Sequence, residues 1–521
     1  MQSPRKVKAV TVGVFLLAWL VSFGFAAIGG DLSAPSLTNH PRLDTIVTNQ
    51  RPLLSIFNSE GGTSPRTYLF QVDTTPTFDG PGLIEYLVPE TPGADAEKIA
   101  KPPRVTSKRL EKGDELQDET TYYWRAKAID ATGTESAWGT EAGGMTARFI
   151  VDLSSDDVFS GLIRTPITEV TTSPGMDSQN IADPGGYAAA ETYWIGYSSQ
   201  NRHWIKFDLG EPEAVSTIWM LSRRMEISGR PQDFVWQYSA SGDSWTDIEE
   251  TRTKDADGLR HLLEIEPVTA RYFRLLITGW HGPAPVINEI LLYSPGTPSL
   301  PNIPNDPYVL VVGNGFTGTG GSNVLNMVKG AGLGLETLYV PYYEVSMEML
   351  RKLDPQPVAI ITSGFGRWYE TIPMFEFNGE YEIIRQEANI PLLGICGGHQ
   401  LLVMAYGYTF ARDMGRGFYT RSVEYLTEDF YPIHIEIDDP IFDGMPNPFY
   451  GPEYHGWDVV VLQDDEEDVY LSLAVSDWMG NEIIKHKDRM VYGEQFHGER
   501  NQPFNVARMF QINFLRMALD R

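Results

Sequence analysis

The sequence predicts a multidomain protein in which two all-β domains precede one doubly wound α/β domain, after an N-terminal transmembrane or signal segment. Three observations support this prediction. Short segments of residues 33–295 alternate apolar and polar residues, and Gly, Pro and Asp clusters separate them. After residue 306, continuous apolar runs alternate with helical stretches, as expected for buried parallel strands joined by helices. An uncharged apolar run also follows the basic start of the chain.

Composition limits the partners and the chemistry. The 521 residues have a formal net charge of −28 and include one cysteine, Cys396. So acidic a chain lacks the Lys/Arg surface that nucleic acid requires, and electrostatic docking on anionic lipid is disfavoured for the same reason. A single cysteine excludes an intrachain disulfide and a Cys-rich zinc site. We predict no metal centre and no cofactor.

The first 31 residues are expected to be a signal peptide or a signal anchor. The basic MQSPRKVK precedes AVTVGVFLLAWLVSFGFAAIGG, an uncharged run from Ala9 to Gly30. A run of about 20 apolar residues can span a bilayer, and the basic end stays cytoplasmic. Gly24-Phe25-Ala26 also fits a cleavage site, so both alternatives stay open. Either one predicts an extracytoplasmic protein, membrane-anchored or released into the periplasm or the medium.

Residues 33–152 are expected to form a β-sandwich that acts as a spacer. The segments RTYLFQVDTT (66–75) and TYYWRAKAIDATG (121–133) alternate in polarity and are rich in Tyr, Val, Phe and Thr. The aromatic-rich second segment resembles the late strands of a fibronectin type III domain. No polar cluster in this region indicates chemistry.

Residues 153–295 resemble the discoidin, or coagulation factor type C, domain. The phrases HWIKFDLG (203–210), ARYFRLLITG (270–279) and VINEILLY (286–293) carry the resemblance by their order and spacing. It implies a β-sandwich whose end loops bind sugars or membrane lipids. Alternation predicts a core that includes Trp204, Phe207, Leu209, Phe234 and Trp245. The candidate loop contacts, for which ordinary packing is the alternative, are Tyr193, Trp194, Arg223, Arg224, Trp280 and His281.

A proline-rich linker at 296–305 precedes the last domain, residues 306–521. Pro residues favour extended polyproline geometry, so the linker should be stiff. Apolar runs at 308–315, 357–366, 389–398 and 489–499 predict strands, and the stretches at 346–353, 379–388 and 399–407 predict helices. Functional residues of such sheets gather beyond the carboxyl ends of the strands.

Cys396 lies in PLLGICGGHQLL (391–402), between a predicted strand and a predicted helix. A strand–turn–helix elbow exposes its central residue, and the neighbouring glycines permit such a turn. The helix N-terminus favours the thiolate, and the N–H of Gly397 points to where an oxyanion would form. Gly364, in the turn after the neighbouring strand, is the candidate second donor. A buried structural thiol is the alternative.

A base and an orienting acid follow in GEQFHGE. On an extended strand, residues two apart share a face, so His497 and Glu499 should project together. The glutamate can fix the imidazole tautomer while the histidine exchanges protons with Cys396.

The motifs GICGGHQ and QFHGE resemble those of the class I glutamine amidotransferases. The resemblance covers residues 306–521 and implies a flavodoxin-like fold that hydrolyses a γ-glutamyl amide through a thioester. It implies roles for these residues: Cys396 as nucleophile, His497 as base, Glu499 as orienting acid, Gly397 and Gly364 as oxyanion donors, and Gln400, Tyr454 and His455 as substrate contacts. The family usually has Pro between the His and the Glu, where this chain has Gly498.

Three functions are compatible with the sequence. The first is an exported or membrane-tethered amidotransferase that a discoidin-like module holds on envelope glycan or lipid, with a separate synthase as ammonia acceptor. The second is a γ-glutamyl peptide hydrolase that uses water as acceptor. The third is a surface-interaction protein with an inactive amidotransferase-like domain.

Overall fold

The computed structural model describes most of the chain. The described residues are 31–37, 45–47, 49–90, 105–139, 146–151, 161–176, 194–222, 227–256, 258, 260–315, 321–364, 373–387, 389–406, 410–412, 432–453, 455, 457–459, 469–476, 481–500 and 506–521. No helix within these ranges is both long and apolar enough to cross a bilayer. Only Asp31 of the expected leader falls inside them, so the leader stays a prediction.

The first region forms two β-sheets around a shared core. The order is β1-β3-β6 in one sheet and β2-β8-β7-β4-β5 in the other. The bounds are β1 Ser36–Leu37, β2 Thr45–Val47, β3 Leu53–Phe57, β4 Thr67–Asp73, β5 Ile84–Pro89, β6 Val105–Arg109, β7 Thr120–Ile129 and β8 Ala147–Val151. Ile56 of the smaller sheet and Phe70 and Trp124 of the larger one share a buried cluster. The region is therefore a β-sandwich, and its fibronectin type III character stays a prediction.

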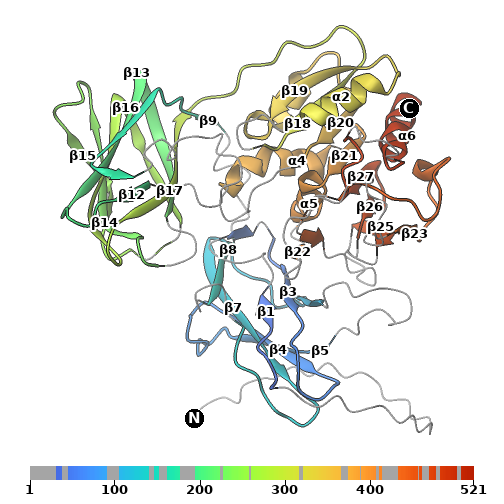
Figure 1. Ribbon diagram of the computed structural model, residues 1–521, viewed down its shortest axis with the longest axis horizontal. Helices are drawn as coiled ribbons and strands as arrows, with labels where there is room; N and C mark the ends of the chain where they lie inside the picture. The colour runs from blue at the N-terminus through green and yellow to red at the C-terminus, as the bar shows by residue number, and fades with distance from the viewer. Residues whose placement is uncertain are drawn as a thin grey trace.

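The second region is a single antiparallel sheet of nine strands that encloses its own core (Figure 1). Its strands are β9 Leu162–Arg164, β10 Glu169–Thr172, β11 Gly175–Met176, β12 Trp194–Gly196, β13 His203–Ser222, β14 Pro231–Ser239, β15 Thr246–Thr253, β16 Arg260–Trp280 and β17 Val286–Pro295. The central order is β11-β12-β17-β13-β16-β14-β15, because the long strands β13 and β16 pair along most of their length.

Burial tests the side-chain predictions in this region. Phe207, Leu209 and Phe234 are buried, as the alternation predicted, whereas Trp204 and Trp245 are partly exposed and the prediction for them was wrong. For Trp194 the structure supports ordinary packing over a loop contact, because this residue lies in β12 with no exposed surface. Trp280 and His281 are partly exposed, and Tyr193, Arg223 and Arg224 lie outside the described residues.

The third region is an α/β domain built on an eight-stranded sheet. Strands β19, β18, β20, β21 and β27 are parallel, and β26, β25 and β23 extend the sheet in antiparallel fashion. Its elements are β18 Tyr308–Gly313, α2 Ser322–Gly330, β19 Glu336–Pro341, η2 Tyr342–Glu344, α3 Met347–Lys352, β20 Ala359–Thr362, η4 Met374–Phe377, α4 Asn378–Gln386, β21 Leu392–Ile395, α5 Gly397–Met404, β22 Phe410–Arg412, β23 Ile433–Ile435, η5 Pro440–Phe442, β24 Trp457–Val459, β25 Tyr470–Ser476, β26 Ile483–His486, β27 Val491–Glu494 and α6 Arg508–Leu519.

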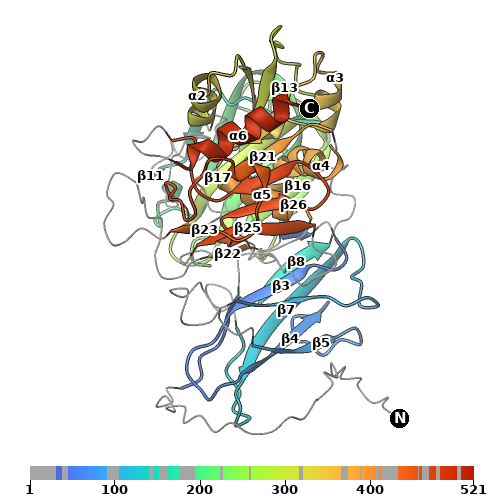
Figure 2. The ribbon, with the colours of Figure 1, turned by 90° about the vertical axis from the view of Figure 1, so that its right-hand side faces the viewer.

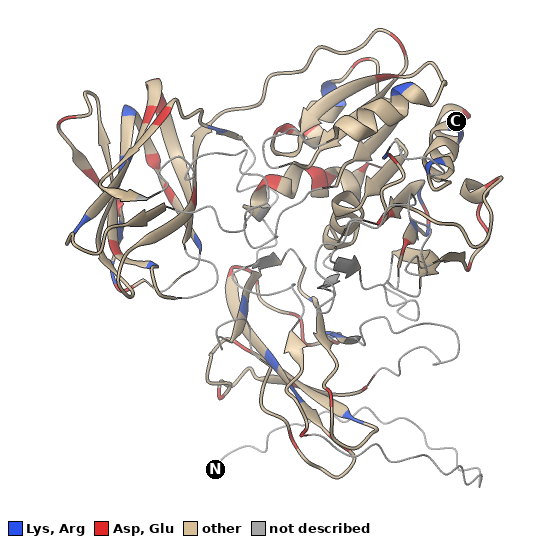
Figure 3. Ribbon diagram, viewed as in Figure 1, with Lys and Arg blue, Asp and Glu red and all other residues tan. Residues whose placement is uncertain are grey.

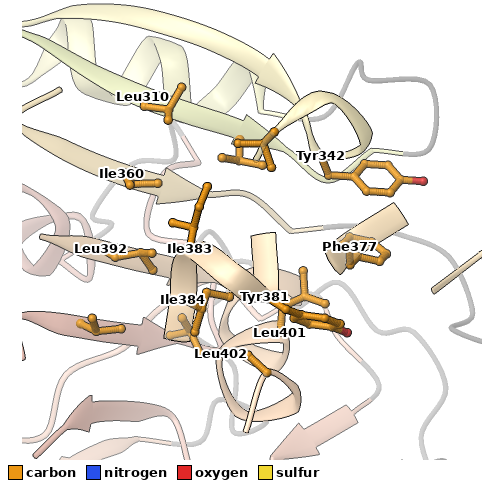
Figure 4. Packing of buried hydrophobic residues seen from close by; sticks show 14 of the residues in the cluster. Leu310, Tyr342, Ile360, Phe377, Tyr381, Ile383, Ile384, Leu392, Leu401 and Leu402 are labelled. Carbon is orange, nitrogen blue, oxygen red and sulfur yellow. The ribbon is translucent and has the colours of Figure 1, made fainter. Parts of the chain in front are cut away.

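Helices cover both faces of this sheet, as the doubly wound prediction requires. Side chains of α3, α4 and α5 pack with one face in a single buried cluster, and those of α2 and α6 pack with the other face. Figure 4 shows Ile383 and Ile384 of α4 and Leu401 and Leu402 of α5 meeting strand residues such as Ile360. Strands β18, β20 and β21 are buried throughout, which explains why they are continuous apolar runs in the sequence.

A buried ion pair joins the second region to the α/β domain. Arg164 of β9 forms a bidentate pair with Glu376 of η4, with both N···O distances at 2.6 Å. Tyr293 and Tyr342 donate their hydroxyls to the same carboxylate, each at 2.8 Å. Phe375 packs beside this pair in an apolar cluster with β13 and β17. The side chain of Glu376 is only 2% exposed, so this contact is a desolvated interface.

The first region also meets the α/β domain, and Figure 2 shows it below that domain's sheet. Strand β2 contacts η4, and Asn49 Nδ2 donates to the Tyr406 carbonyl at 3.3 Å. The segment η4 is therefore held from two sides. Figure 3 shows acidic and basic positions interspersed over all three regions. The net charge of −28 is thus spread over the chain and is not confined to one segment.

Candidate active site

The candidate site lies beyond the carboxyl ends of β20, β21 and β27. Cys396 connects β21 to α5 with φ 51° and ψ −102°, a conformation that costs free energy for any residue with a side chain. Its N–H donates to the Glu494 carbonyl at 2.8 Å, and its own carbonyl accepts from Gln400 N at 3.1 Å. The strained elbow is therefore fixed by backbone hydrogen bonds on both sides.

Two glycines are required around the elbow because the backbone segments approach closely. A Cβ on Gly394 would lie 2.6 Å from the Gly398 carbonyl oxygen. A Cβ on Gly398 would lie 2.5 Å from the Thr362 carbonyl oxygen of β20. Real Cβ atoms essentially never come so close, so larger residues would displace the elbow from the neighbouring strand.

His497 and Glu499 form a buried pair next to Cys396. The distance from His497 Nδ1 to Glu499 Oε1 is 2.7 Å, and the two side chains are 10% and 6% exposed. Burial lowers the pKa of His497, but the Glu499 carboxylate and Cys396, which also hydrogen-bonds the imidazole, outweigh it, so this pKa lies well above its ordinary value. Burial raises the pKa of Glu499, yet the imidazole outweighs that effect and keeps it below the ordinary value. The pair therefore favours imidazolium and carboxylate.

The reason predicted for this pairing was wrong, because β27 ends at Glu494 and both residues lie beyond it. The N–H of His497 donates to the Pro452 carbonyl at 2.8 Å, which fixes the backbone of the following turn. Glu499 approaches the imidazole across this turn. Alternation along a strand is not involved.

The side chains of Cys396 and His497 both lie next to Gly364. A Cβ built on Gly364 would lie 3.1 Å from Cys396 Cβ and 3.3 Å from His497 Cε1. Thiol and imidazole thus crowd the same turn, and its backbone is next to both. The N–H of Gly397 belongs to the first turn of α5, where amides have no partner within the helix. These positions suit the oxyanion donors that the sequence predicted.

Two of the three predicted substrate contacts, Gln400 and His455, each have a polar side chain as hydrogen-bond partner. Gln400 is buried in α5, and its Nε2 donates to Gln495 Oε1 at 3.2 Å. His455 is buried and its Nε2 lies 2.6 Å from Glu453 Oε2. Tyr454 lies outside the described residues. Gln495 and Glu453 were missed in the sequence because no local pattern indicates which polar neighbours a buried side chain will meet.

In the described part of the chain, one group of side chains that could ligate a metal lies close together: Glu453, His455 and Glu482. Their potential ligand atoms lie within 4.8 Å of one another, and all three side chains are buried. The short contact between His455 and Glu453, and the hydrogen bond of 2.5 Å from Ser476 Oγ to Glu482 Oε1, already give these groups protein partners. We therefore treat these three residues as a hydrogen-bonded cluster that holds His455 in place, and we assign no ion to it.

Glu380 of α4 supports the turn that contains Gly364 and was also missed in the sequence. Asn314 Nδ2 donates to the Ser363 carbonyl at 2.8 Å and to Glu380 Oε1 at 3.4 Å. Glu380 is 1% exposed, and its burial raises its pKa to about 8. The carboxyl is therefore neutral at pH 7, behind the turn that faces Cys396.

Replacing Glu380 with glutamine should flatten the dependence of stability on pH. The unfolded chain releases the Glu380 proton near pH 4.5, whereas the folded chain holds it to about pH 8. Between these values the folded state binds one more proton, so this residue lowers the free energy of unfolding by about 1.4 kcal/mol per unit rise in pH. Urea unfolding at pH 5.5 and 7.5 should show a smaller difference for Glu380→Gln than for the wild type. The exposed Glu336→Gln is the control, and an unchanged slope in Glu380→Gln would contradict the assignment.

Two parts of the chain match known protein families. Residues 319–517 match the family described as glutamine amidotransferase class-I, and residues 165–290 match the F5/8 type C domain. A stretch of 118 residues, 23% of this chain, is 37% identical to a glutamine-hydrolyzing GMP synthase subunit of Methanococcus maripaludis and covers 55% of that protein. The chain thus spans about half the length of the first curated relatives it matches.

Two further relatives are covered over most of their length. The corresponding glutamine-hydrolyzing GMP synthase subunit of Methanothermobacter thermautotrophicus is 32% identical over 174 residues, which are 33% of this chain and 84% of that protein. Anthranilate synthase component 2 of the same organism is 30% identical over 200 residues, which are 37% of this chain and 88% of that protein. The chain therefore belongs to the class-I glutamine amidotransferase family and also carries an F5/8 type C domain, the discoidin-like domain expected from its sequence.

Proposed function

We propose that the chain is an extracytoplasmic hydrolase of the glutamine amidotransferase type, in which Cys396 cleaves a γ-glutamyl amide. The supporting observation is the convergence at Gly364. A Cβ at this position would contact both Cys396 and His497, and Glu499 holds the imidazole at 2.7 Å. Nucleophile, base and orienting acid thus meet beside a backbone turn that can donate to an oxyanion.

The proposed reaction has two halves. The thiol proton of Cys396 passes to His497, and the sulfur attacks the carbonyl carbon of the amide. The resulting oxyanion accepts hydrogen bonds from the N–H groups of Gly397 and Gly364. The C–N bond then breaks, and the leaving amine takes a proton from His497, which leaves a thioester. Water attacks the thioester as His497 removes its proton, and the C–S bond breaks to release glutamate and the thiol.

The neighbouring polar side chains are candidates to contact the glutamyl part of the substrate. Gln400 follows Cys396 by one turn of α5 and is held by Gln495, and His455 is held by Glu453. Because both side chains are fixed by a partner, they are preorganised to hydrogen-bond a polar substrate. Glutamine is the expected substrate, a separate synthase is the expected ammonia acceptor, and a γ-glutamyl peptide hydrolysed with water as acceptor is the alternative.

The proposal is tested by labelling the full chain with a glutamine analogue that carries an electrophilic ketone. With one cysteine in the chain, a thiol adduct can form only at Cys396, and peptide mass spectrometry locates it. We expect labelling at pH 7 at least about tenfold faster than that of free cysteine, because the imidazole of His497 lies next to the sulfur. Glutamine should slow the labelling by competition.

The control is His497→Ala, which keeps the thiol and removes the base. Labelling of the wild type no faster than that of free cysteine would favour the surface-interaction protein without enzymatic activity. Ammonia release from glutamine, compared with amine release from a γ-glutamyl dipeptide, distinguishes the amidotransferase reaction from the peptide hydrolase reaction.

We also propose that the discoidin-like domain holds the enzyme on envelope glycan or lipid, outside the cytoplasm. The F5/8 type C match and the basic, then apolar, start of the chain support this. The net charge of −28 favours neutral glycan over anionic lipid. Retention of the full chain on insoluble envelope polysaccharide, without retention on anionic vesicles, is the expected result; the reverse result would assign the domain to lipid.

A further inference from the structure

Glu494 contacts both the elbow at Cys396 and the turn of residues 497–499 from inside the protein. It is the last residue of β27 and has no exposed surface. Its carbonyl accepts the N–H of Cys396 at 2.8 Å, so its backbone fixes the nucleophile. Its side chain carries a carboxyl group into the protein interior, where an acid without hydrogen-bond partners would be unfavourable.

The carboxyl of Glu494 receives two hydrogen bonds. Gln511 Nε2, from α6, donates to Oε1, and the N–H of Gly498 donates to the same carboxyl group. Oε2 is buried, and no partner for it is found among the described residues. Burial and the nearby Glu499 carboxylate raise the pKa of Glu494 well above its ordinary value. A neutral acid fits this pattern, since one oxygen accepts and the other holds the proton.

Gly498 lies between His497 and Glu499, where class I glutamine amidotransferases usually have proline. A Cβ at this position would lie 2.9 Å from Gln511 Nε2 and 3.1 Å from the Ala507 carbonyl oxygen. Proline would therefore collide with Gln511, and it would also lack the N–H that Glu494 accepts. Glycine leaves room for the buried amide and, unlike proline, supplies this donor.

We infer that Glu494 and Gln511 are positioning residues that hold the turn of residues 497–499, so that His497 faces Cys396. The inference rests on the proposed function for its catalytic consequence, but the restraint on the turn can be measured without catalysis. Hydrogen bonds from the protein interior here replace the stiffness that proline gives the equivalent turn. The flexibility that glycine would otherwise add to the site is thereby removed.

The test compares Glu494→Gln, which keeps an accepting carbonyl, with Glu494→Leu, which has a similar volume and no acceptor. We expect Glu494→Gln to keep kcat within about threefold of the wild type, since the amide oxygen can still accept the hydrogen bonds from Gln511 and Gly498. Glu494→Leu should lose about 10²-fold in kcat with little change in KM, because a misplaced base affects the reaction more than binding. A buried leucine keeps the core apolar, and a melting curve checks that this variant folds.

Hydrogen exchange of the peptide that contains residues 495–500 provides a readout independent of activity. The Gly498 amide should exchange slowly in the wild type and in Glu494→Gln, and about tenfold faster in Glu494→Leu. If the wild type hydrolyses no amide, the proposed function fails while this exchange result still decides the inference. Equal exchange in all three proteins, or full kcat in Glu494→Leu, would overturn it.

A compensating variant strengthens the test. Gly498→Pro should be inactive alone because of the collision with Gln511, whereas Gly498→Pro combined with Gln511→Ala and Glu494→Leu should regain most of the activity. A purely structural role of Glu494 would not produce this recovery, since each added change would then lower activity further.

Discussion

Replacing Cys396 with alanine is expected to abolish amide hydrolysis while the protein stays folded. Without the sulfur no thioester can form, so kcat should fall by at least about 10³-fold, as expected when a covalent nucleophile is removed. Alanine must adopt the same φ of 51° as the cysteine, so the elbow keeps its strain and its hydrogen bonds. The free energy of unfolding should therefore change by about 1 kcal/mol or less. Ammonia release and urea unfolding measure the two quantities.

Cys396→Ser separates chemistry from shape, because the hydroxyl occupies nearly the same volume. It should be inactive too, since a serine hydroxyl is far less acidic than a thiol. Activity above about a tenth of the wild-type value in Cys396→Ala would place the nucleophile elsewhere. The catalytic part of the proposal would then be lost, and the family membership would remain.

The second large effect is expected from Arg164→Leu at the interface between the discoidin-like domain and the α/β domain. This change leaves the Glu376 carboxylate buried without its cation, and breaking a buried pair in this way costs about 3–5 kcal/mol. Tyr293 and Tyr342 still donate to the carboxylate but do not neutralise it. We expect the two domains to separate, which limited proteolysis at residues 296–305 and the melting curve would report.

Two companion variants make this result specific. Arg164→Leu combined with Glu376→Gln should regain much of the lost stability, because the buried charge is then absent while the tyrosines keep an acceptor. Arg252→Leu is the matched control, since Arg252 also pairs with carboxylates, those of Asp247 and Glu249, but lies at an exposed position. It should leave the melting temperature nearly unchanged. A melting curve of Arg164→Leu like that of the wild type would mean that the domains do not depend on this pair.

We expect the interface to affect the site because η4 leads directly into α4, whose Glu380 supports the turn of Gly364 through Asn314. The segment η4 that carries it is contacted by the discoidin-like domain through Arg164 and by the first region through β2. Loss of the pair should therefore also lower the activity of Arg164→Leu. Arg252→Leu should retain it.

Much of the fold could be predicted because local patterns reflect local burial. Strands β18, β20 and β21 are buried on both faces, so each is a continuous apolar run, and the alternation in β13 and β16 follows their one-sided burial. For Trp194 the sequence left both alternatives open, because an aromatic residue near a loop suits a ligand contact and a core equally well; the structure buries it.

For the site, the elbow at Cys396 and the residues of the pair His497 and Glu499 could be predicted from the sequence alone. Glycine spacing and residue type are local properties, so they are visible without a structure. Other features became visible only in the folded chain. The pair meets across a turn beyond β27, and Glu494 and Gln511 hydrogen-bond next to that turn. Arg164 pairs with Glu376 of the neighbouring domain. These contacts join segments far apart in the chain, and the burial that shifts their charges exists only once the sheet, its helices and the neighbouring domain have packed.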